Sequence, residues 1–372
     1  MSFERAGFLV AAVMALGALA LPLGGGTDLA AHPALLAAIS LAAVACVGAA
    51  MLPHGAALLG LIGAALCCKV TLVLLADPGV EGHAGAGFWS LVLAAWLAAA
   101  LAVTRMTTLR PRRKALRRLN DAAIPLLFGA FVIYLWEAAV RGFGVPSVLT
   151  PAPSATAARF AASLPVLGED FVQTFVRGVL SGYAIGCGAG FLVAVVAHRF
   201  DFLARGVLPL GNFVSALPIV GIAPIMVMWF GFDWPSKTAV VAVVTFFPML
   251  VNALAGFSAA GAMERDLMRS YAAGPAQTLI KLHLPAALPF VFNALKINST
   301  LALIGAIVAE FFGTPTLGIG FRISTEVGRM ALDMVWAEIA LSAIAGMAFY
   351  GAVALAERAT TFWHPSLRSS LG

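Results

Sequence analysis

The chain alternates between long uninterrupted stretches of hydrophobic residues and short polar segments. In a bilayer every backbone N–H and C=O group must be bonded within the protein, so about twenty consecutive apolar residues form one spanning helix. Ten stretches meet this description, and each predicts a transmembrane helix. Their approximate ranges are 7–23, 34–52, 56–76, 88–103, 122–140, 171–197, 206–230, 238–257, 286–312 and 331–356.

The composition supports this interpretation. Hydrophobic residues make up 61% of the 372 residues and charged residues only 11%, whereas soluble domains have about 45–50% and about 25%. Such a chain cannot cover itself with polar surface in water. The composition excludes a soluble enzyme, a nucleic-acid-binding domain and a disordered chain. We predict an all-α, polytopic membrane protein with no nucleic-acid partner.

Lysine and arginine set the expected orientation, because loops on the cytoplasmic side carry an excess of them. If both termini are cytoplasmic, the inner segments hold fifteen of these residues and the outer loops five. We therefore expect a multi-pass protein of the cell inner membrane with both termini inside. The first stretch resembles a signal peptide, but it is longer than usual and is expected to be retained; whether it is cleaved stays open.

A basic segment, residues 104–120 (TRMTTLRPRRKALRRLN), divides the chain. It contains seven cations and no acid, which is typical of a topology anchor held by anionic membrane lipid at about 1 kcal/mol per cation. Residues 1–103 form four extra helices rich in Ala and Leu, whose role the sequence does not show. Residues 121–372, with six helices and distinctive loops, form the predicted functional domain.

Several polar residues lie within the later spans. A charged group at the bilayer centre costs about 2.5–3.5 kcal/mol, so such groups usually face the bundle interior or an aqueous path. A translocation path is one interpretation, with Pro218 as a helix-kinking residue and Asn252, Asn298 and Glu310 as polar lining. Hydrogen bonding between helices is an equally good interpretation of the asparagines.

The longest polar stretch of the second half is residues 258–285, SAAGAMERDLMRSYAAGPAQTLIKLHLP. Its centre predicts a short amphipathic helix, followed by a break at Gly274 and Pro275 and a second helical piece ending at Pro285. Such a helix is suited to docking in a cleft of a partner protein. The alternative is a plain interfacial helix that rests on lipid headgroups.

This loop resembles the signature of the membrane subunits of ATP-binding-cassette importers, which reads Glu-Ala-Ala, three residues, Gly, nine residues and Ile-x-Leu-Pro. The final part is matched by Leu282-His283-Leu284-Pro285. Counting back from it places Ala272 at the glycine and Asp266-Leu267-Met268 at Glu-Ala-Ala. The acid is kept, and both alanines and the glycine differ.

Two further stretches agree with the resemblance. The sequences ALPIVGIAP at 216–224, WFG at 229–231 and FFP at 246–248 are similar to the nitrate, sulfonate and taurine branch of these permeases. AEFFG at 309–313, followed by LG at 317–318, resembles the acid-and-glycine outer loop of that branch. ALIGAIV at 302–308 is closer to members that import pyrimidine precursors or riboflavin.

The resemblance implies a six-helix type I importer core that forms the path together with a second permease subunit, expected to be an identical copy. It also implies a dimer of a separate ATPase subunit below the membrane and an external solute-binding protein that selects the substrate, a small polar solute. ATPase coupling would fall to Asp266, Arg269, Ser270, Tyr271, Ala272, Ala273, Gly274, Leu284 and Pro285.

Other function classes find less support. No phosphate loop of the G-x-x-x-x-G-K-[ST] type occurs in the sequence, so this chain is not the ATP-hydrolysing subunit. The six histidines are scattered without catalytic partners at a motif spacing, so we predict neither an enzyme nor a cofactor. An ion-coupled secondary transporter that uses Glu137, Glu310 or Glu338 is the alternative, although it would need matching broken helices in two halves.

Overall fold

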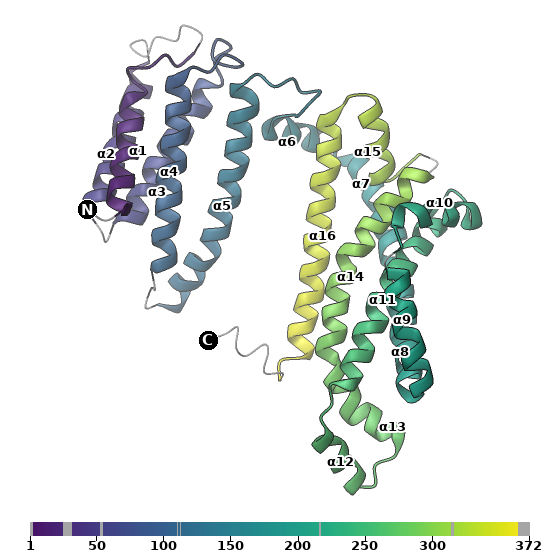
Figure 1. Ribbon diagram of the computed structural model, residues 1–372. Helices are drawn as coiled ribbons and strands as arrows, with labels where there is room; N and C mark the ends of the chain where they lie inside the picture. Colours follow the sequence, from purple (N-terminus) through teal and green to yellow (C-terminus); the bar gives the residue numbers. More distant parts are fainter. Residues whose placement is uncertain are drawn as a thin grey trace. The chain divides into compact units, whose positions relative to one another are not determined.

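The computed structural model describes residues 3–24, 32–52, 55–109, 111, 113–215, 217–313 and 316–363 (Figure 1). Helices follow one another along this part of the chain, and two of them, η2 and η3, are π-helices. Their bounds are α1 Phe3–Gly17, α2 Pro33–Met51, α3 Ala56–Leu74, α4 Ala86–Thr108, α5 Lys114–Gly142, α6 Pro153–Ala162, α7 Leu164–Phe171, η2 Val172–Leu180, α8 Ser181–Arg199, α9 Asp201–Ser215, α10 Ile219–Phe230, α11 Trp234–Ser258, α12 Ala262–Ser270, α13 Pro275–Thr278, η3 Leu279–His283, α14 Leu284–Phe312, α15 Ile319–Gly328 and α16 Leu332–Thr360.

The prediction of an all-α polytopic membrane protein is confirmed. Within the described residues, eight helical segments are long and apolar enough to cross a membrane. They correspond to eight of the ten predicted stretches. The first predicted stretch forms α1, which has 15 residues.

The prediction of one continuous helix over 206–230 is wrong. This stretch is divided between α9 and α10, and the backbone at Pro218 is extended, with φ −67° and ψ 124°. The proline ring disfavours the helical conformation of the residue before it, here Leu217, which makes the start of a helix a better place for proline than its middle. Pro218 therefore separates two short helices instead of kinking one long helix. Residue 216 lies outside the described part.

Two compact units make up the chain, residues 1–157 and 158–372, and the division falls within α6. The first unit has its own core of small and aliphatic residues from α1 to α4. The fifth helix joins it: the hydroxyl of Tyr134 lies 2.8 Å from the Thr71 hydroxyl, and Arg141 pairs with Glu81 at 2.9 Å. The structure thus groups α5 with the first four helices, and the start of the functional domain at residue 121 stays a prediction.

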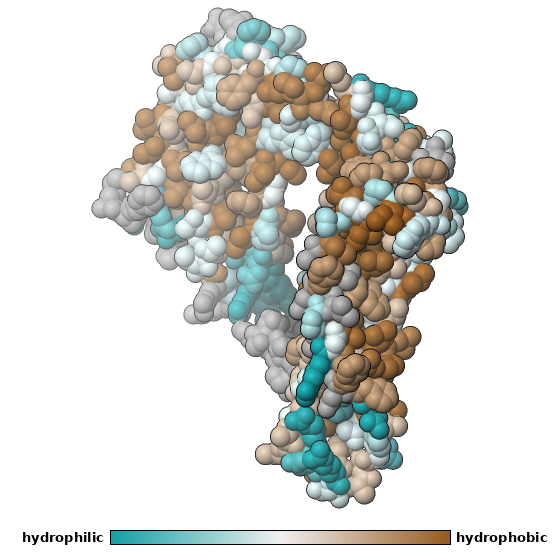
Figure 2. Space-filling view, turned by 45° about the vertical axis from the view of Figure 1, so that its right-hand side comes forward, coloured by the Kyte–Doolittle hydropathy of each residue, from teal (hydrophilic) through white to brown (hydrophobic). Residues whose placement is uncertain are grey.

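The second unit is built around α8, α11 and α14, which pack along one another. Small residues allow the close approach: a Cβ atom at Gly186 would lie 2.1 Å from the Thr245 hydroxyl, and one at Gly190 would lie 2.4 Å from the Phe246 carbonyl. Gly182, Gly186 and Gly190, spaced four residues apart on α8, thus form a small-residue packing face against α11. The short helices α12 and α13 lie at one end of the unit and α15 at the other (Figure 1). Hydrophilic side chains gather at the end that carries α12 (Figure 2).

Candidate functional site

Helix α12 presents an apolar face that no described residue of the second unit covers. None of its residues is buried. Met263, Leu267 and Tyr271 recur every four residues, and they are 82%, 56% and 78% exposed. Residues at this spacing lie on one side of a helix. We call Met263, Leu267 and Tyr271 the docking face.

The end of α12 has a defined geometry. The N–H groups of Ala272 and Ala273 donate to the carbonyls of Arg269 and Met268 at 2.9 and 3.0 Å, which is the pair of bonds of a Schellman helix end. This motif requires a left-handed residue, and Ala272 has φ +49°. Glycine adopts that conformation without strain, and Ala272 is the position at which the importer signature has glycine. The structure therefore explains why the signature has a glycine there.

Both ends of the segment that carries α12 are tied to each other. Nδ1–H of His283 donates to the carbonyl of Phe257 at 2.8 Å, and Phe257 is completely buried. Beside them α11 and α14 touch closely, because a Cβ atom at Gly256 would lie 2.9 Å from the Cα of Ala287. The two ends of the segment thus meet where α11 and α14 are in close contact.

The expected helix end at Pro285 is wrong, whereas the break before Pro275 is confirmed by the extended backbone of Gly274. The helix runs without interruption from Pro275 to Phe312. The five residues before Leu284 form the π-helix η3, and a wider turn of this kind accommodates the missing N–H and the bulky ring of a proline. Leu284 and Pro285 are thus the first turn of α14.

The remaining residues predicted for coupling all lie in α12 or directly after it. Asp266 pairs with Arg269 at 3.3 Å, and both are exposed. The Ser270 hydroxyl donates to the Asp266 carbonyl at 3.0 Å, which completes the last turn of the helix. Tyr271 belongs to the docking face. Met263 and Leu267 were missed, although their spacing from Tyr271 in the sequence would have revealed them.

A cluster of polar residues occupies the end of the second unit that is opposite to α12. The Glu310 carboxylate, buried at the end of α14, accepts hydrogen bonds from the Thr174 hydroxyl at 2.8 Å and from the Gly320 N–H at 2.7 Å. The Thr174 hydroxyl in turn accepts from Ile319 N–H at 2.8 Å. Gly318 has φ +127°, and a Cβ there would lie 2.6 Å from the Glu310 carboxylate. The acid and the glycines of this loop therefore fit together sterically.

Charged residues extend this cluster. The Asp170 carboxylate accepts from Gly318 N–H at 2.6 Å and from the Arg322 guanidinium at 2.7 Å, and this bond raises the pKa of Arg322. Glu338, fully buried on α16, faces the charge of Asp170. The Lys237 ammonium donates to the carbonyls of Phe232 and Gly313. Together with the hydrogen bonds of Glu310, those of Asp170 and Lys237 connect α7, η2, α11, α14 and α15 at one end of the unit.

The four residues predicted to line a path are not brought together. Pro218 starts α10 beside an apolar cavity of about 310 Å³. The amide of Asn252 donates to the Pro248 carbonyl of its own helix at 2.8 Å. Fully buried Asn298 donates to the Thr245 carbonyl on α11 at 2.8 Å, and Glu310 belongs to the cluster at the far end. Their role in transport stays a prediction.

Two of the carboxylates named for an ion-coupled mechanism, Glu137 and Glu310, accept hydrogen bonds from neighbouring groups. Glu137 in the first unit accepts from the Ser154 N–H and hydroxyl at 2.9 and 2.7 Å and from Arg141 at 3.3 Å. Among the described residues, no three His, Cys, Asp or Glu side chains are arranged to hold a metal ion.

Comparison with known proteins places the second unit in a family. Residues 186–368 match the family described as the binding-protein-dependent transport system inner membrane component. A riboflavin transport system permease protein of Chloroflexus aurantiacus is 28% identical over 272 residues, which are 72% of this chain and 98% of that protein.

Two other relatives are transport permeases as well. The formylaminopyrimidine transport permease protein of Halalkalibacterium halodurans is 28% identical over 252 residues, 67% of this chain and 98% of that protein. The taurine transport system permease protein of Escherichia coli is 29% identical over 187 residues, 50% of this chain and 64% of that protein. These findings confirm the predicted resemblance, including the branch.

Proposed function

Because this chain belongs to the family of binding-protein-dependent transport system inner membrane components, a multi-pass permease for a small solute, we propose that a separate ATPase drives it through α12. Family members of this kind are transport components and not enzymes by themselves. The observation that carries the proposal is the uncovered docking face of Met263, Leu267 and Tyr271. A short helix with exposed apolar residues at this spacing suits the groove of a partner protein.

The connections of α12 suit it to transmit force. It leaves α11 at Ser258 and rejoins α14 through α13 and η3, and the hydrogen bond from His283 to Phe257 closes the segment at its base. Since α11 and α14 are closely packed, closure of an ATPase dimer under α12 would shift both helices as one body. In this way the conformational change driven by nucleotide hydrolysis would be transmitted to the helices of the solute path.

The partners follow from the same proposal. An ATPase dimer occupies the cytoplasmic side, a second copy of this chain completes the path, and a solute-binding protein delivers the substrate from outside. The excess of Lys and Arg in the segments of the α12 side supports placing that side, and both termini, in the cytoplasm. Pro218, Asn252, Asn298 and Glu310 remain the proposed path residues. The relatives' names differ in substrate, so the substrate is proposed only as a small polar solute.

The test is purification of the tagged chain from its native membrane, followed by mass spectrometry for a protein with a G-x-x-x-x-G-K-[ST] loop. The wild-type chain should retain such an ATPase, and Leu267→Arg with Tyr271→Arg should lose it. Ala259→Arg is the matched control, because it adds a cation to an exposed position of the same segment outside the docking face. Retention by the double variant would contradict docking through this face.

A second measurement addresses the ion-coupled alternative. Vesicles that contain the chain alone should not concentrate solute when only a proton or sodium gradient is imposed. Accumulation under those conditions would support a secondary transporter based on Glu137, Glu310 or Glu338, and would refute ATP-driven transport.

A further inference from the structure

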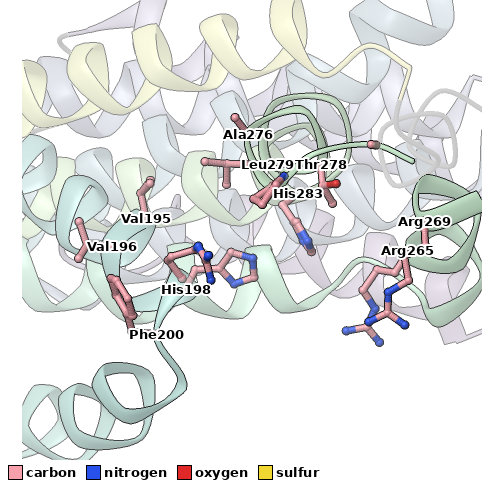
Figure 3. A pocket seen from close by; sticks show the side chains of 13 residues that line it. Val195, Val196, His198, Phe200, Arg265, Arg269, Ala276, Thr278, Leu279 and His283 are labelled. Carbon is pink, nitrogen blue, oxygen red and sulfur yellow. The ribbon is translucent and has the colours of Figure 1, made fainter. Parts of the chain in front are cut away.

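A cavity of about 810 Å³ opens beside α12, at the end of the second unit that carries the docking face. Its walls come from the last turn of α8, from α12 and from the α13–η3 segment. Figure 3 shows Arg265 and Arg269 on one side, His198 and Phe200 on the other, and His283 between them. The docking face residues do not line it, so the cavity is a separate feature.

The lining of the cavity is strongly basic. It includes three arginines, Arg199, Arg265 and Arg269, and the rings of His198 and His283, and the described residues that line it include no aspartate or glutamate. The two rings lie 4.5 Å apart between their centroids. Arg269 also pairs with Asp266 at 3.3 Å, but both are exposed to solvent, and exposed pairs of this kind contribute little. A cavity with this charge favours an anion.

The other half of the lining is apolar. Val195, Val196, Phe200 and Leu279 form it, and the guanidinium of Arg199 lies 5.9 Å from the centroid of the Phe200 ring. The apolar surface continues beyond the cavity along α8, where Ile185, Leu192 and Val196 are exposed at helical spacing. A ligand that fits both parts has an anionic head and a hydrocarbon tail.

We propose that this cavity binds the phosphate group of an anionic phospholipid, whose acyl chain lies along the exposed face of α8. Arginine pairs with phosphate in bidentate geometry, and basic pockets between helices at the cytoplasmic face hold lipid headgroups. A soluble protein loop would satisfy the arginines but could not follow α8 into the bilayer. The placement of this end at the cytoplasmic face rests on the proposed function.

The location gives the bound lipid a consequence for transport. Its phosphate would bridge α8 and α12, so it would restrain the segment that the ATPase is proposed to move. Anionic lipid would then alter the efficiency of coupling in addition to holding the protein in the membrane.

The experiment uses the full chain without an ATPase, so failure of docking does not affect it. The chain is reconstituted in phosphatidylcholine nanodiscs with and without phosphatidylglycerol, and co-purified lipid is counted by native mass spectrometry. In parallel, inorganic phosphate is titrated calorimetrically into the pure phosphatidylcholine sample. The variant is Arg199→Gln with Arg265→Gln, and the matched control is Lys281→Gln with Arg358→Gln, which removes two exposed cations that do not line the cavity.

We expect the wild type and the control to retain phosphatidylglycerol selectively and the cavity variant to retain about tenfold less. Heat from inorganic phosphate that the cavity variant loses would support the phosphate site and assign it to a free anion. Equal retention of phosphatidylglycerol by variant and control, with no phosphate heat, would overturn the proposal. Failure of the wild-type chain to co-purify with an ATPase, while its lipid binding is intact, would count against the proposed function alone.

Discussion

Nδ1 of His283 and the backbone oxygen of Phe257, 2.8 Å apart, join the two ends of the segment that carries α12. Phe257 is buried at the end of α11, and His283 directly precedes α14. The bond therefore holds the two ends of this loop together at the point where they join α11 and α14. If α12 is the part that an ATPase moves, this bond keeps the motion from being lost in flexing of the loop.

Replacing His283 should reduce the transport achieved per ATP. His283→Ala removes the hydrogen bond, worth about 1 kcal/mol, and lets the ends of the segment move separately. We expect ATP hydrolysis by the assembled transporter to continue while solute uptake falls, measured together in proteoliposomes. Ser258→Ala is the control, because its hydroxyl donates to the Leu254 carbonyl of the same helix and to no other described residue. An unchanged ratio of uptake to hydrolysis in His283→Ala would contradict this role.

Ala272, the left-handed residue that ends α12, can be replaced so that the helix end becomes either more or less stable. A non-glycine residue in the left-handed conformation raises the free energy of the folded chain by about 1–2 kcal/mol. Ala272→Gly should therefore stabilise the C-terminal end of α12 and preserve ATPase binding. Ala272→Val, with a branched Cβ, should fray it and weaken that binding. Hydrogen exchange of the α12 amides is the measurement. Slower exchange in the valine variant than in the glycine variant would show that the Schellman end is not important.

At the other end of the unit, Thr174 links two elements through one hydroxyl. It donates to Glu310 and accepts from Ile319 N–H, and it is fully buried. Thr174→Val keeps the shape but leaves a buried N–H without its partner, so stability should fall by about 1–3 kcal/mol. Thr174→Ser keeps the hydroxyl and should lose less. Thermal unfolding of the detergent-purified chain compares them, and equal melting temperatures for the two variants would show that the hydroxyl is dispensable.

The sequence predicted those features that depend on local pattern. The apolar runs predicted the membrane helices. The spacing back from Pro285 located α12, and a short amphipathic segment between two membrane helices has few other structures that it can adopt. The division at Pro218 was missed since hydropathy alone cannot distinguish one helix from two short helices in a continuous apolar run. Hydrophobic residues stand on both sides of Pro218, and Pro209 and Pro224 in the same stretch lie inside helices, so neither hydropathy nor proline alone identified the boundary.

Contacts between distant segments were beyond the sequence. Asp170 and Arg322 meet across many intervening residues at 2.7 Å, and neither was singled out, because ion pairs of this separation leave no pattern along the chain. In the sequence His283 is one of six scattered histidines, and its partner is a backbone carbonyl, which leaves no signature in the sequence. Met263 and Leu267, in contrast, could have been predicted, because their helical spacing from Tyr271 is visible in the sequence.

A substitution of Asn298 can distinguish two roles of this residue, lining the solute path and packing between helices. Its amide nitrogen donates to the Thr245 carbonyl at 2.8 Å and lies 3.2 Å from the Cys187 sulfur, and its side chain is completely buried between helices. Interhelical bonds of this type are worth about 0.6–1.7 kcal/mol in membranes. Because Asn298 is completely buried, a packing role predicts that Asn298→Leu lowers thermal stability by about that amount and leaves the KM for solute unchanged, whereas the proposed path role predicts a higher KM.

The matched control for this change is Thr245→Ala on the partner helix, which removes a hydroxyl that donates to the Val241 carbonyl at 2.8 Å and keeps the backbone carbonyl that accepts from Asn298. Uptake at several solute concentrations, measured for both variants with the same ATPase, separates the two roles. A rise in KM in Asn298→Leu at unchanged stability would assign Asn298 to the path. A loss of stability with unchanged KM would assign it to the packing of α11 against α14, since a side chain that never meets the solute can affect transport only through the amount of folded protein.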